Sequence, residues 1–318
     1  DFFNEAIDWQ VNITLLPRQP VSSFKPLVYA AAFMKGYTPN TLVFDTKTIF
    51  KAYPEDYAPE NYDGKEHGPL QLKSALAGSL NIPAVKLLYI TGVDRVLDLA
   101  EALGYTTLKD RSRFGLSLVL GGAEVKLLEH AAAFRSFAEH GMYRAPSAIV
   151  QIQDAEGSVV YERRNNQARS VVVPEVAHTI TSILSNNALR TFIFGSNSFL
   201  QLPDRPAAVK TGTTNDFHDA WALGAVPSLT AGVWVGNNDN SPMKKGADGS
   251  KLAAPIWQSF MKKALAGTPV QEFVPPKPSS ANKPILKGEG LGEVTVILDK
   301  ASGKRATSLT PDSFKIEK

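Results

Sequence analysis

Ser22 and Lys25, in the segment QPVSSFKP of residues 19–26, are three residues apart, a spacing that brings two side chains to the same face of a helix. Pro26 is tolerated only near a helix start, so we expect Ser22 at a helix N-terminus. There the free backbone N–H groups and the helix dipole favour negative charge beside the hydroxyl. The segment therefore predicts either an activated serine or an ordinary helix cap.

Two further motifs combine residue types that can bind or transfer protons. Ser79 and Asn81 form an S-x-N motif between two helical patterns, where a short loop would aim both side chains into a cleft. Serine and asparagine also favour helix ends through local hydrogen bonds, so a structural role stays open. Lys210, Thr211 and Gly212 form a K-T-G motif after a β-branched, apolar approach typical of a strand. Gly212 would leave room for an extended ligand against the strand edge.

Apolar periodicity predicts the elements that hold these motifs. Helices are expected at 22–34, 70–79, 83–91, 94–105, 124–141, 174–187 and 254–265. Strands are expected at 148–154 and 158–164, joined as a hairpin, and at 207–212, 219–226 and 229–237. A helical block is followed by strands and a final helix, so the predicted fold class is α/β of the α+β type, with an antiparallel sheet flanked by helices.

Other ionisable residues form weaker patterns. Asp219 and Trp221 are interpreted as strand residues that pack on a neighbour, not as a catalytic dyad. Glu129–His130 and Glu139–His140 lie ten residues apart on a helical pattern that turns them to different faces, so they are interpreted as ordinary surface or buried-edge pairs. The five histidines show no metal-ligand spacing, and we expect no metal site.

Composition limits the classes of protein that the chain can be. Its 318 residues are 43% hydrophobic and 20% charged, which is typical of a globular protein with one large or two ordinary domains. The net charge is +3 and the basic residues are scattered, so no nucleic-acid surface is expected. Cysteine is absent, which excludes disulfides. No apolar run reaches the roughly 18 residues of a membrane span.

A change of composition after Gly267 predicts a domain boundary. Residues 1–267 hold the helical and strand patterns, and we expect them to form one compact domain. The segment FVPPKPSSANKP that follows is rich in proline and serine, as linkers are. Residues 268–318 are therefore expected to be a linker and an accessory C-terminal tail.

The three motifs occur in the order S-x-x-K, S-x-N, K-T-G, the set found in serine β-lactamases and penicillin-binding proteins. The segments RQPVSSFKPLVYAAA, NYDGKEHGPLQLKSALAGSLNIPAVKLL, GLSLVLGGAEVKLLEHAAAF, KTGTTNDFHDAWALG and LTAGVWVGN closely resemble the transpeptidase domain of bifunctional class A penicillin-binding proteins. The resemblance covers about residues 1–267. It implies a penicillin-binding protein or serine β-lactamase-like fold, with an all-helical lobe beside the sheet domain and the active cleft between them.

The resemblance also implies a role for each motif residue. Ser22 would be the nucleophile, and Lys25 its base if burial and a second cation, Lys210, depress a lysine pKa that is ordinarily about 10.4. Ser79 would relay a proton to the leaving amine, and Asn81 would hold a substrate amide. The terminal carboxylate of the substrate would be bound by Lys210, Thr211 and Thr213. The backbone N–H groups of Ser22 and Thr213 would stabilise the oxyanion.

Two residues depart from the family pattern. Where the family has glycine before the nucleophile, this chain has Val21, a β-branched residue that resists positive φ. Because the surrounding motifs are intact, we expect Val21 at an ordinary negative φ. Where the family has IDGQVN, this chain has IDWQVN with Trp9, which changes the expected path of the first segment.

The function implied is a D,D-transpeptidase that crosslinks peptidoglycan stem peptides ending in D-Ala-D-Ala and that is acylated by β-lactam antibiotics. A D,D-carboxypeptidase or a β-lactamase is an alternative, as is a catalytically silent or sensory penicillin-binding module motivated by Val21. No cofactor is expected. The expected location is the cell envelope, at the outer face of the bacterial plasma membrane, with membrane attachment only through an anchor absent from this chain.

Overall fold

A three-stranded antiparallel sheet is the centre of the fold. The structure is a computed structural model that describes residues 11–51, 55–163, 168–289 and 296–317, so Trp9 lies outside the described residues. The strands are β9 (Ala208–Thr213), β10 (Asp219–Val226) and β11 (Leu229–Gly236), in the order β11-β10-β9. All three coincide with the predicted strands to within about one residue. β10 is buried along its whole length because it lies in the middle of the sheet.

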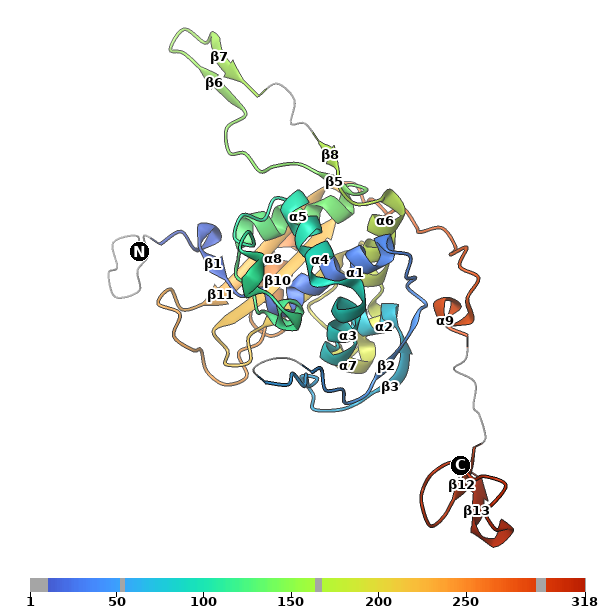
Figure 1. The fold of residues 1–318 in the computed structure, drawn as a ribbon. Coiled ribbons are helices and arrows are strands. Elements are labelled where there is room, and N and C mark those ends of the chain that lie inside the picture. Colours follow the sequence, from blue (N-terminus) through green and yellow to red (C-terminus); the bar gives the residue numbers. More distant parts are fainter. Residues whose placement is uncertain (1–10, 52–54, 164–167, 290–295, 318) are drawn as a thin grey trace.

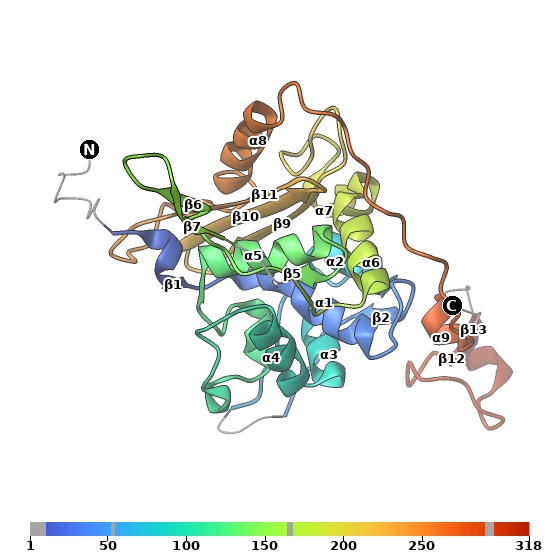
Figure 2. The ribbon, with the colours of Figure 1, turned by 90° about the horizontal axis from the view of Figure 1, so that it is seen from above.

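Helices cover both faces of this sheet. Figure 2 shows α8 (Ala253–Ala264) on one face and α5 (Leu127–Ala138) on the other. The α8 face has its own apolar cluster, in which the ring of Trp257 occupies the space that a side chain at Gly224 would fill. Tight helix-on-sheet packing therefore requires a glycine in β10.

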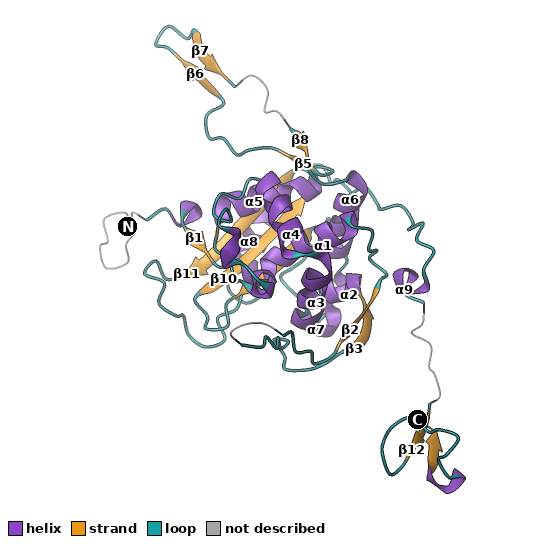
Figure 3. Ribbon diagram, viewed as in Figure 1, coloured by secondary structure: helices purple, strands orange, loops and turns teal. Residues whose placement is uncertain are grey.

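A helical lobe lies beside the sheet, as the sequence predicts (Figures 1 and 3). It is built from α1 (Lys25–Met34), α2 (Leu72–Ala77), α3 (Asn81–Thr91), α4 (Val93–Ala102) and α6 (Pro174–Ser185). α1 packs against α3, α4 and α6, and nine of its ten residues are buried. One continuous apolar cluster joins this lobe to the α5 face of the sheet, so α1 is held rigidly between the two parts.

Asp219 and Trp221 confirm the interpretation that they are packing residues. The Asp219 carboxylate accepts a hydrogen bond of 2.7 Å from the Trp234 indole on the neighbouring strand. Trp221 is fully buried in the apolar cluster that joins the sheet to the helical lobe. Both side chains therefore stabilise the sheet.

Short antiparallel pairs and single turns complete the fold. The pairs are β1 (Pro17–Arg18) with β4 (Val125–Lys126), β2 (Leu42–Asp45) with β3 (Gly68–Gln71), β5 (Met142–Tyr143) with β8 (Arg169–Ser170), β6 (Gln151–Gln153) with β7 (Val159–Glu162), and β12 (Ile297–Asp299) with β13 (Lys315–Glu317). The turns are η2 (Ile13–Leu15), η3 (Val21–Phe24), η4 (Arg111–Arg113), η5 (Leu116–Leu120), η6 (Asn187–Arg190), α7 (Thr191–Phe194), α9 (Pro284–Lys287) and η7 (Asp312–Phe314). Among the described residues, no helix combines the length and the apolar character needed to cross a membrane.

The predicted hairpin is present as β6 and β7. Figure 1 shows it projecting from the body of the fold, and every residue of both strands is exposed. Val150 and Val160 are 68% and 67% exposed. The hairpin therefore adds little to the buried core.

The segment after α8 contacts the domain at several points. Phe273 packs on the main apolar cluster, and the Leu286 carbonyl in α9 accepts a hydrogen bond from the Thr38 hydroxyl. The proline-rich segment is thus extended and follows the surface of the domain before β12 and β13.

Candidate active site around Ser22

Ser22 lies in η3, the 3₁₀ turn that leads directly into α1. Pro26 occupies the first turn of α1, so the expected position of Ser22 near a helix start is confirmed. The Ser22 side chain is half-buried, and within the described part of the chain its hydroxyl makes no hydrogen bond. The hydroxyl is therefore available to a substrate.

Lys25 is fully buried and points at the S-x-N motif. Its Nζ donates hydrogen bonds to the Ser79 carbonyl at 2.6 Å and to Asn81 Oδ1 at 2.7 Å. Burial, and then the charge of Lys210, hold the pKa of Lys25 well below its usual value, while Asp45 acts in the opposite direction. A neutral amine has two N–H groups and one lone pair, so these two bonds leave the lone pair to accept a proton.

Ser79 owes its placement to the C-terminal turn of α2. The backbone N–H groups of Ser79 and Leu80 donate to the carbonyls of Leu76 and Ala75, the hydrogen-bond pattern of a Schellman motif. In that motif the residue at the position of Ser79 adopts the left-handed conformation, and Ser79 has φ 60°. The predicted short loop between two helices is therefore confirmed, and its geometry directs the Ser79 hydroxyl toward β9.

Asn81 begins α3 and is already hydrogen-bonded at both ends of its amide. Its oxygen accepts from Lys25, and its Nδ2 donates to the Glu60 carbonyl at 2.7 Å. Its backbone N–H donates to Asn61 Oδ1 at 2.8 Å. In this structure Asn81 thus positions Lys25, and a role in holding a substrate amide would require these bonds to be exchanged.

A buried carboxylate that the sequence analysis did not identify supports this corner. Asp45 is fully buried, and Asn61 Nδ2 donates to its two oxygens at 2.9 and 2.7 Å. Asn61 in turn accepts from the first backbone N–H groups of α3 at Asn81 and Ile82. No spacing rule connects Asp45 with Asn61, because they lie in a long segment between helices.

Lys210, on β9, approaches the same serine from the sheet. Its Nζ donates to Ser79 Oγ at 2.7 Å and to the Thr211 carbonyl at 2.9 Å. Burial and the nearby charge of Arg190 lower the pKa of Lys210 to about 7. The charge of Lys210 acts in the expected direction on the pKa of Lys25, after burial, which is the larger cause.

Arg190 is a second cation that sequence reasoning missed. It is 2% exposed, and its guanidinium donates to the carbonyls of Leu184, Leu200 and Val209. Burial lowers its own pKa to about 10. A buried guanidinium directly behind β9 keeps this end of the site positive, which favours an anionic substrate group.

The other two residues of the K-T-G motif and the adjacent Thr213 have different environments. A side chain at Gly212 would place its Cβ 2.3 Å from the Pro20 carbonyl oxygen, so this glycine allows β9 to pack on η3. The space expected for a ligand at Gly212 is therefore filled by the Pro20 carbonyl. The Thr213 hydroxyl accepts from the Gly249 backbone at 2.9 Å, and Thr211 is buried.

The expectation for Val21 was wrong. Val21 has φ 49°, in the left-handed region that glycine adopts freely, and its side chain is buried. A side chain at Gly121 would place its Cβ 3.2 Å from both Val21 Cα and Cγ2, so η5 ends directly against this residue. A β-branched residue at positive φ costs about 1–3 kcal/mol, which the surrounding contacts must offset.

A histidine lies next to η3, the turn that contains Ser22, although it is distant in sequence. His130 of α5 is fully buried, and its Nε2 is 2.8 Å from Ser23 Oγ. The interpretation of His130 as an ordinary buried-edge residue therefore omitted a specific contact. Helical periodicity could indicate that His130 is buried, but not that η3 packs beside it.

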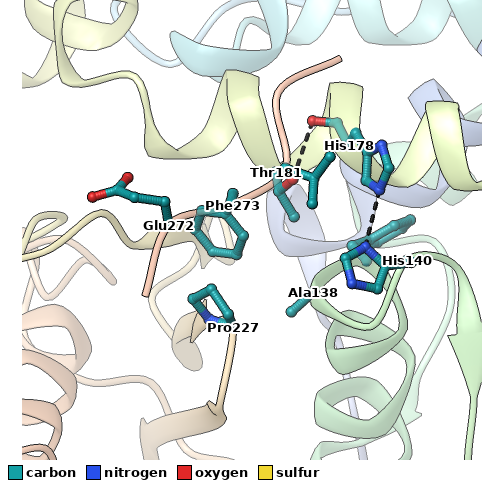
Figure 4. Close-up of a pocket in the computed structure, with 9 residues that line it drawn as sticks. Ala138, His140, His178, Thr181, Pro227, Glu272 and Phe273 are labelled. Carbon is teal, nitrogen blue, oxygen red and sulfur yellow. Dashed lines mark hydrogen bonds between the residues drawn. The ribbon is translucent and has the colours of Figure 1, made fainter. Parts of the chain in front are cut away.

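A pocket elsewhere in the fold is too small to hold a substrate. Figure 4 shows His140 and His178 facing each other, with a hydrogen bond of 3.0 Å between their rings, and Phe273 nearby. The cavity is about 20 Å³, room for roughly one water molecule. None of its lining residues belongs to the group around Ser22, and its walls include the segment that follows α8.

Comparisons with known proteins identify the family of the chain. Residues 4–262 match the family model of the penicillin-binding protein transpeptidase domain. Penicillin-binding protein 1A of Aquifex aeolicus is 36% identical over 264 residues, which are 82% of this chain and 35% of that protein. Penicillin-binding protein 2D of Bacillus subtilis is 35% identical over 272 residues, 83% of this chain and 38% of that protein.

A solved structure shows the same fold. The PonA1 protein of Mycobacterium tuberculosis, in complex with penicillin V, is similar with a TM-score of 0.74 and 26% identity, over 84% of this chain and 74% of that chain. The chain spans just over a third of the length of the two curated relatives above. The family match covers most of the chain, and the chain belongs to the family of penicillin-binding protein transpeptidase domains.

Proposed function

We propose that this domain is a serine D,D-transpeptidase that crosslinks peptidoglycan stem peptides through an acyl-enzyme on Ser22. The observation that carries the proposal is the buried amine of Lys25, whose pKa is held low by burial and by Lys210. A base of this kind can take the proton of a serine hydroxyl at neutral pH. The PonA1 complex with penicillin V supports β-lactams as ligands.

Acylation uses the free hydroxyl of Ser22. Its Oγ attacks the carbonyl between the last two D-alanines, and its proton passes to the lone pair of Lys25. Backbone N–H groups of Ser22 and Thr213 stabilise the oxyanion. When the C–N bond breaks, the proton moves through the Ser79 hydroxyl to the leaving amine, and the terminal D-alanine departs.

An amine from a neighbouring stem peptide then attacks the acyl-enzyme. It forms the crosslinking amide, and its proton returns by the same route while Ser22 is released. The charge of Lys210 and the hydroxyls of Thr211 and Thr213 hold the terminal carboxylate of the donor peptide or of a β-lactam. The substrate lies outside the plasma membrane, so the domain acts in the cell envelope, at the outer face of the plasma membrane.

A module that binds penicillin but acylates slowly is the competing function. The positive φ of Val21 favours it, because a strained residue beside the nucleophile can misalign Ser22. A D,D-carboxypeptidase or β-lactamase would use the same first step and let water resolve the acyl-enzyme.

Intact-mass spectrometry after a brief incubation with a penicillin tests the proposal. A stable adduct is expected on the parent protein and on the control Ser112→Ala, and none on Ser22→Ala. Peptide mapping should place the adduct on the peptide that contains Ser22. Label on Ser79, or an unlabelled parent protein, would refute the assignment, and rapid return to free protein would indicate a β-lactamase.

A stem pentapeptide ending in D-Ala-D-Ala separates the remaining activities. With a fluorescent D-amino acid as acceptor, a transpeptidase releases D-alanine and forms the exchanged peptide. A carboxypeptidase releases D-alanine and forms only the shortened peptide.

A further inference from the structure

Three buried side chains connect the helical lobe to the backbone just before Ser22. The Tyr105 hydroxyl, which follows α4, is 2.5 Å from His130 Nδ1. His130 Nε2 is 2.8 Å from Ser23 Oγ, and Ser23 Oγ is 2.6 Å from the Pro20 carbonyl oxygen. Tyr105, His130 and Ser23 are each at most 3% exposed. Solvent therefore does not compete for these bonds.

The direction of each hydrogen bond follows from the number of protons. The Pro20 carbonyl can only accept, so the single hydroxyl proton of Ser23 goes to it, and Ser23 Oγ must accept from His130 Nε2–H. Burial lowers the pKa of His130 to about 3, so the ring is neutral and its Nδ1 accepts from Tyr105. Burial also raises the pKa of Tyr105, which keeps that phenol protonated. The donors thus all point toward Pro20.

The Pro20 carbonyl is the group that sets the φ angle of Val21. Its carbon atom is one of the four that define this angle, and its oxygen accepts from both Ser23 Oγ and the Ser23 backbone N–H at 3.0 Å. On the other side, Gly212 leaves just enough space for the same oxygen. Because these two bonds join Pro20 to Ser23 across Val21, they hold both ends of the turn in which Val21 is in the left-handed region.

We propose that His130 is a positioning residue for acylation: through Ser23 it holds the Pro20 carbonyl, and thereby holds Val21 at the positive φ that presents Ser22. The inference rests on the proposed function of Ser22 as the nucleophile. A glycine at position 21 would adopt this φ without support, whereas valine requires it. The network and Val21 should therefore be coupled in acylation.

A double-mutant cycle tests this coupling. The second-order acylation rate with a fluorescent penicillin and the Tm are measured for the parent, His130→Leu, Val21→Gly and the double variant. His130→Leu should slow acylation by about 10²-fold in the parent, the scale of an angstrom-sized misplacement. In the Val21→Gly background the same change should slow acylation by less than about threefold, because glycine needs no support.

Two further variants separate positioning from stability. Phe134 is also buried on α5 but packs against Phe137. Phe134→Leu should lower the Tm, and its effect on the acylation rate should be the same in the parent and in the Val21→Gly background. His130→Gln should recover part of the rate, because its amide can donate to Ser23 and accept from Tyr105. If His130→Leu does not fold, Tyr105→Phe takes its place and should slow acylation only while Val21 is present.

Equal slowing in both backgrounds, or an unchanged rate in His130→Leu, would overturn the inference while leaving Ser22 as the nucleophile. A parent protein that penicillin does not acylate would instead refute the proposed function. In that case a crystal structure of His130→Leu still decides the inference. Val21 is expected to leave positive φ, and retention of the parent conformation would contradict the proposal.

Discussion

The Nζ atom of Lys210 lies 2.7 Å from the hydroxyl oxygen of Ser79, although 131 residues separate them in the chain. Lys25 donates to the carbonyl of the same serine. Ser79 is thus bonded to both lysines, one from α1 and one from β9, and a change at this residue acts on the whole group.

Ser79→Gly and Ser79→Ala should have equal activity but different stability. Both remove the hydroxyl, so we expect acylation to fall by about 10²-fold or more in each. Only alanine retains the strain of a left-handed residue, which costs about 1–2 kcal/mol. Urea unfolding should therefore find the glycine variant more stable by about 1 kcal/mol. Equal stabilities would show that the φ of 60° is not maintained in solution.

Lys25→Arg should slow acylation by about 10²-fold or more. Arginine keeps the positive charge but stays protonated, so it cannot take the proton of Ser22. Stopped-flow measurement with a fluorescent penicillin checks this. Lys35→Arg, at the end of the same helix, is the matched control and should acylate at the parent rate. A near-parental rate in Lys25→Arg would mean that another group is the base.

Acylation should decline as pH rises through about 7. Lys210, whose pKa is lowered to about 7, loses the charge that attracts the substrate carboxylate. Stability should change in the opposite sense. Between about pH 7 and 10 the unfolded lysine binds a proton that the folded one lacks, so this group raises the free energy of unfolding as pH increases. The titration of Lys210 therefore lowers activity without lowering stability.

Removing the charge of Arg190 should move that decline to higher pH. Arg190→Gln eliminates the cation that helps to lower the pKa of Lys210, while an amide can still donate to the nearby carbonyls. Arg205→Gln, in the loop before β9, is the control and should leave the pH profile unchanged, because the Arg205 guanidinium contacts Asp204 and Thr268. An identical profile in Arg190→Gln would show that burial alone sets the pKa of Lys210.

Gly212→Ala should slow acylation by at least about 10²-fold. Its Cβ would lie 2.3 Å from the Pro20 carbonyl oxygen, so either η3 or β9 must shift next to Ser22. Gly115→Ala is the matched control, because nothing lies within 4 Å of the added Cβ and the backbone there is extended. A parental rate in Gly212→Ala would mean that the strand moves without disturbing the serine.

The parts of the fold that local patterns determine were predictable. Strand alternation located β9, β10 and β11, and the AGSLN segment indicated the turn between α2 and α3. The depressed pKa of Lys25 followed from its need to be neutral and from the presence of Lys210. The catalytic roles of these residues stay predictions that the experiments above address.

The parts that depend on tertiary packing were not predictable. Valine ordinarily avoids positive φ, so the conformation of Val21 depends on packing against Gly121 and on contacts of the Pro20 carbonyl with Gly212. Both glycines are distant from Val21 in the sequence. His130 and Arg190 were overlooked for the same reason. Each acts on a segment more than ten residues away, and their own local patterns indicate only a buried helix and a turn.

The hairpin of β6 and β7 has a practical consequence for protein engineering. Its tip, around Gly157, turns back through backbone hydrogen bonds between Asp154 and its neighbours, and no residue of its strands is buried. Surface turns of this kind accept inserted sequence readily. A reporter or affinity tag placed at the tip would thus project from the body of the domain. The domain could be immobilised through such a tag with Ser22 still accessible to antibiotics in solution.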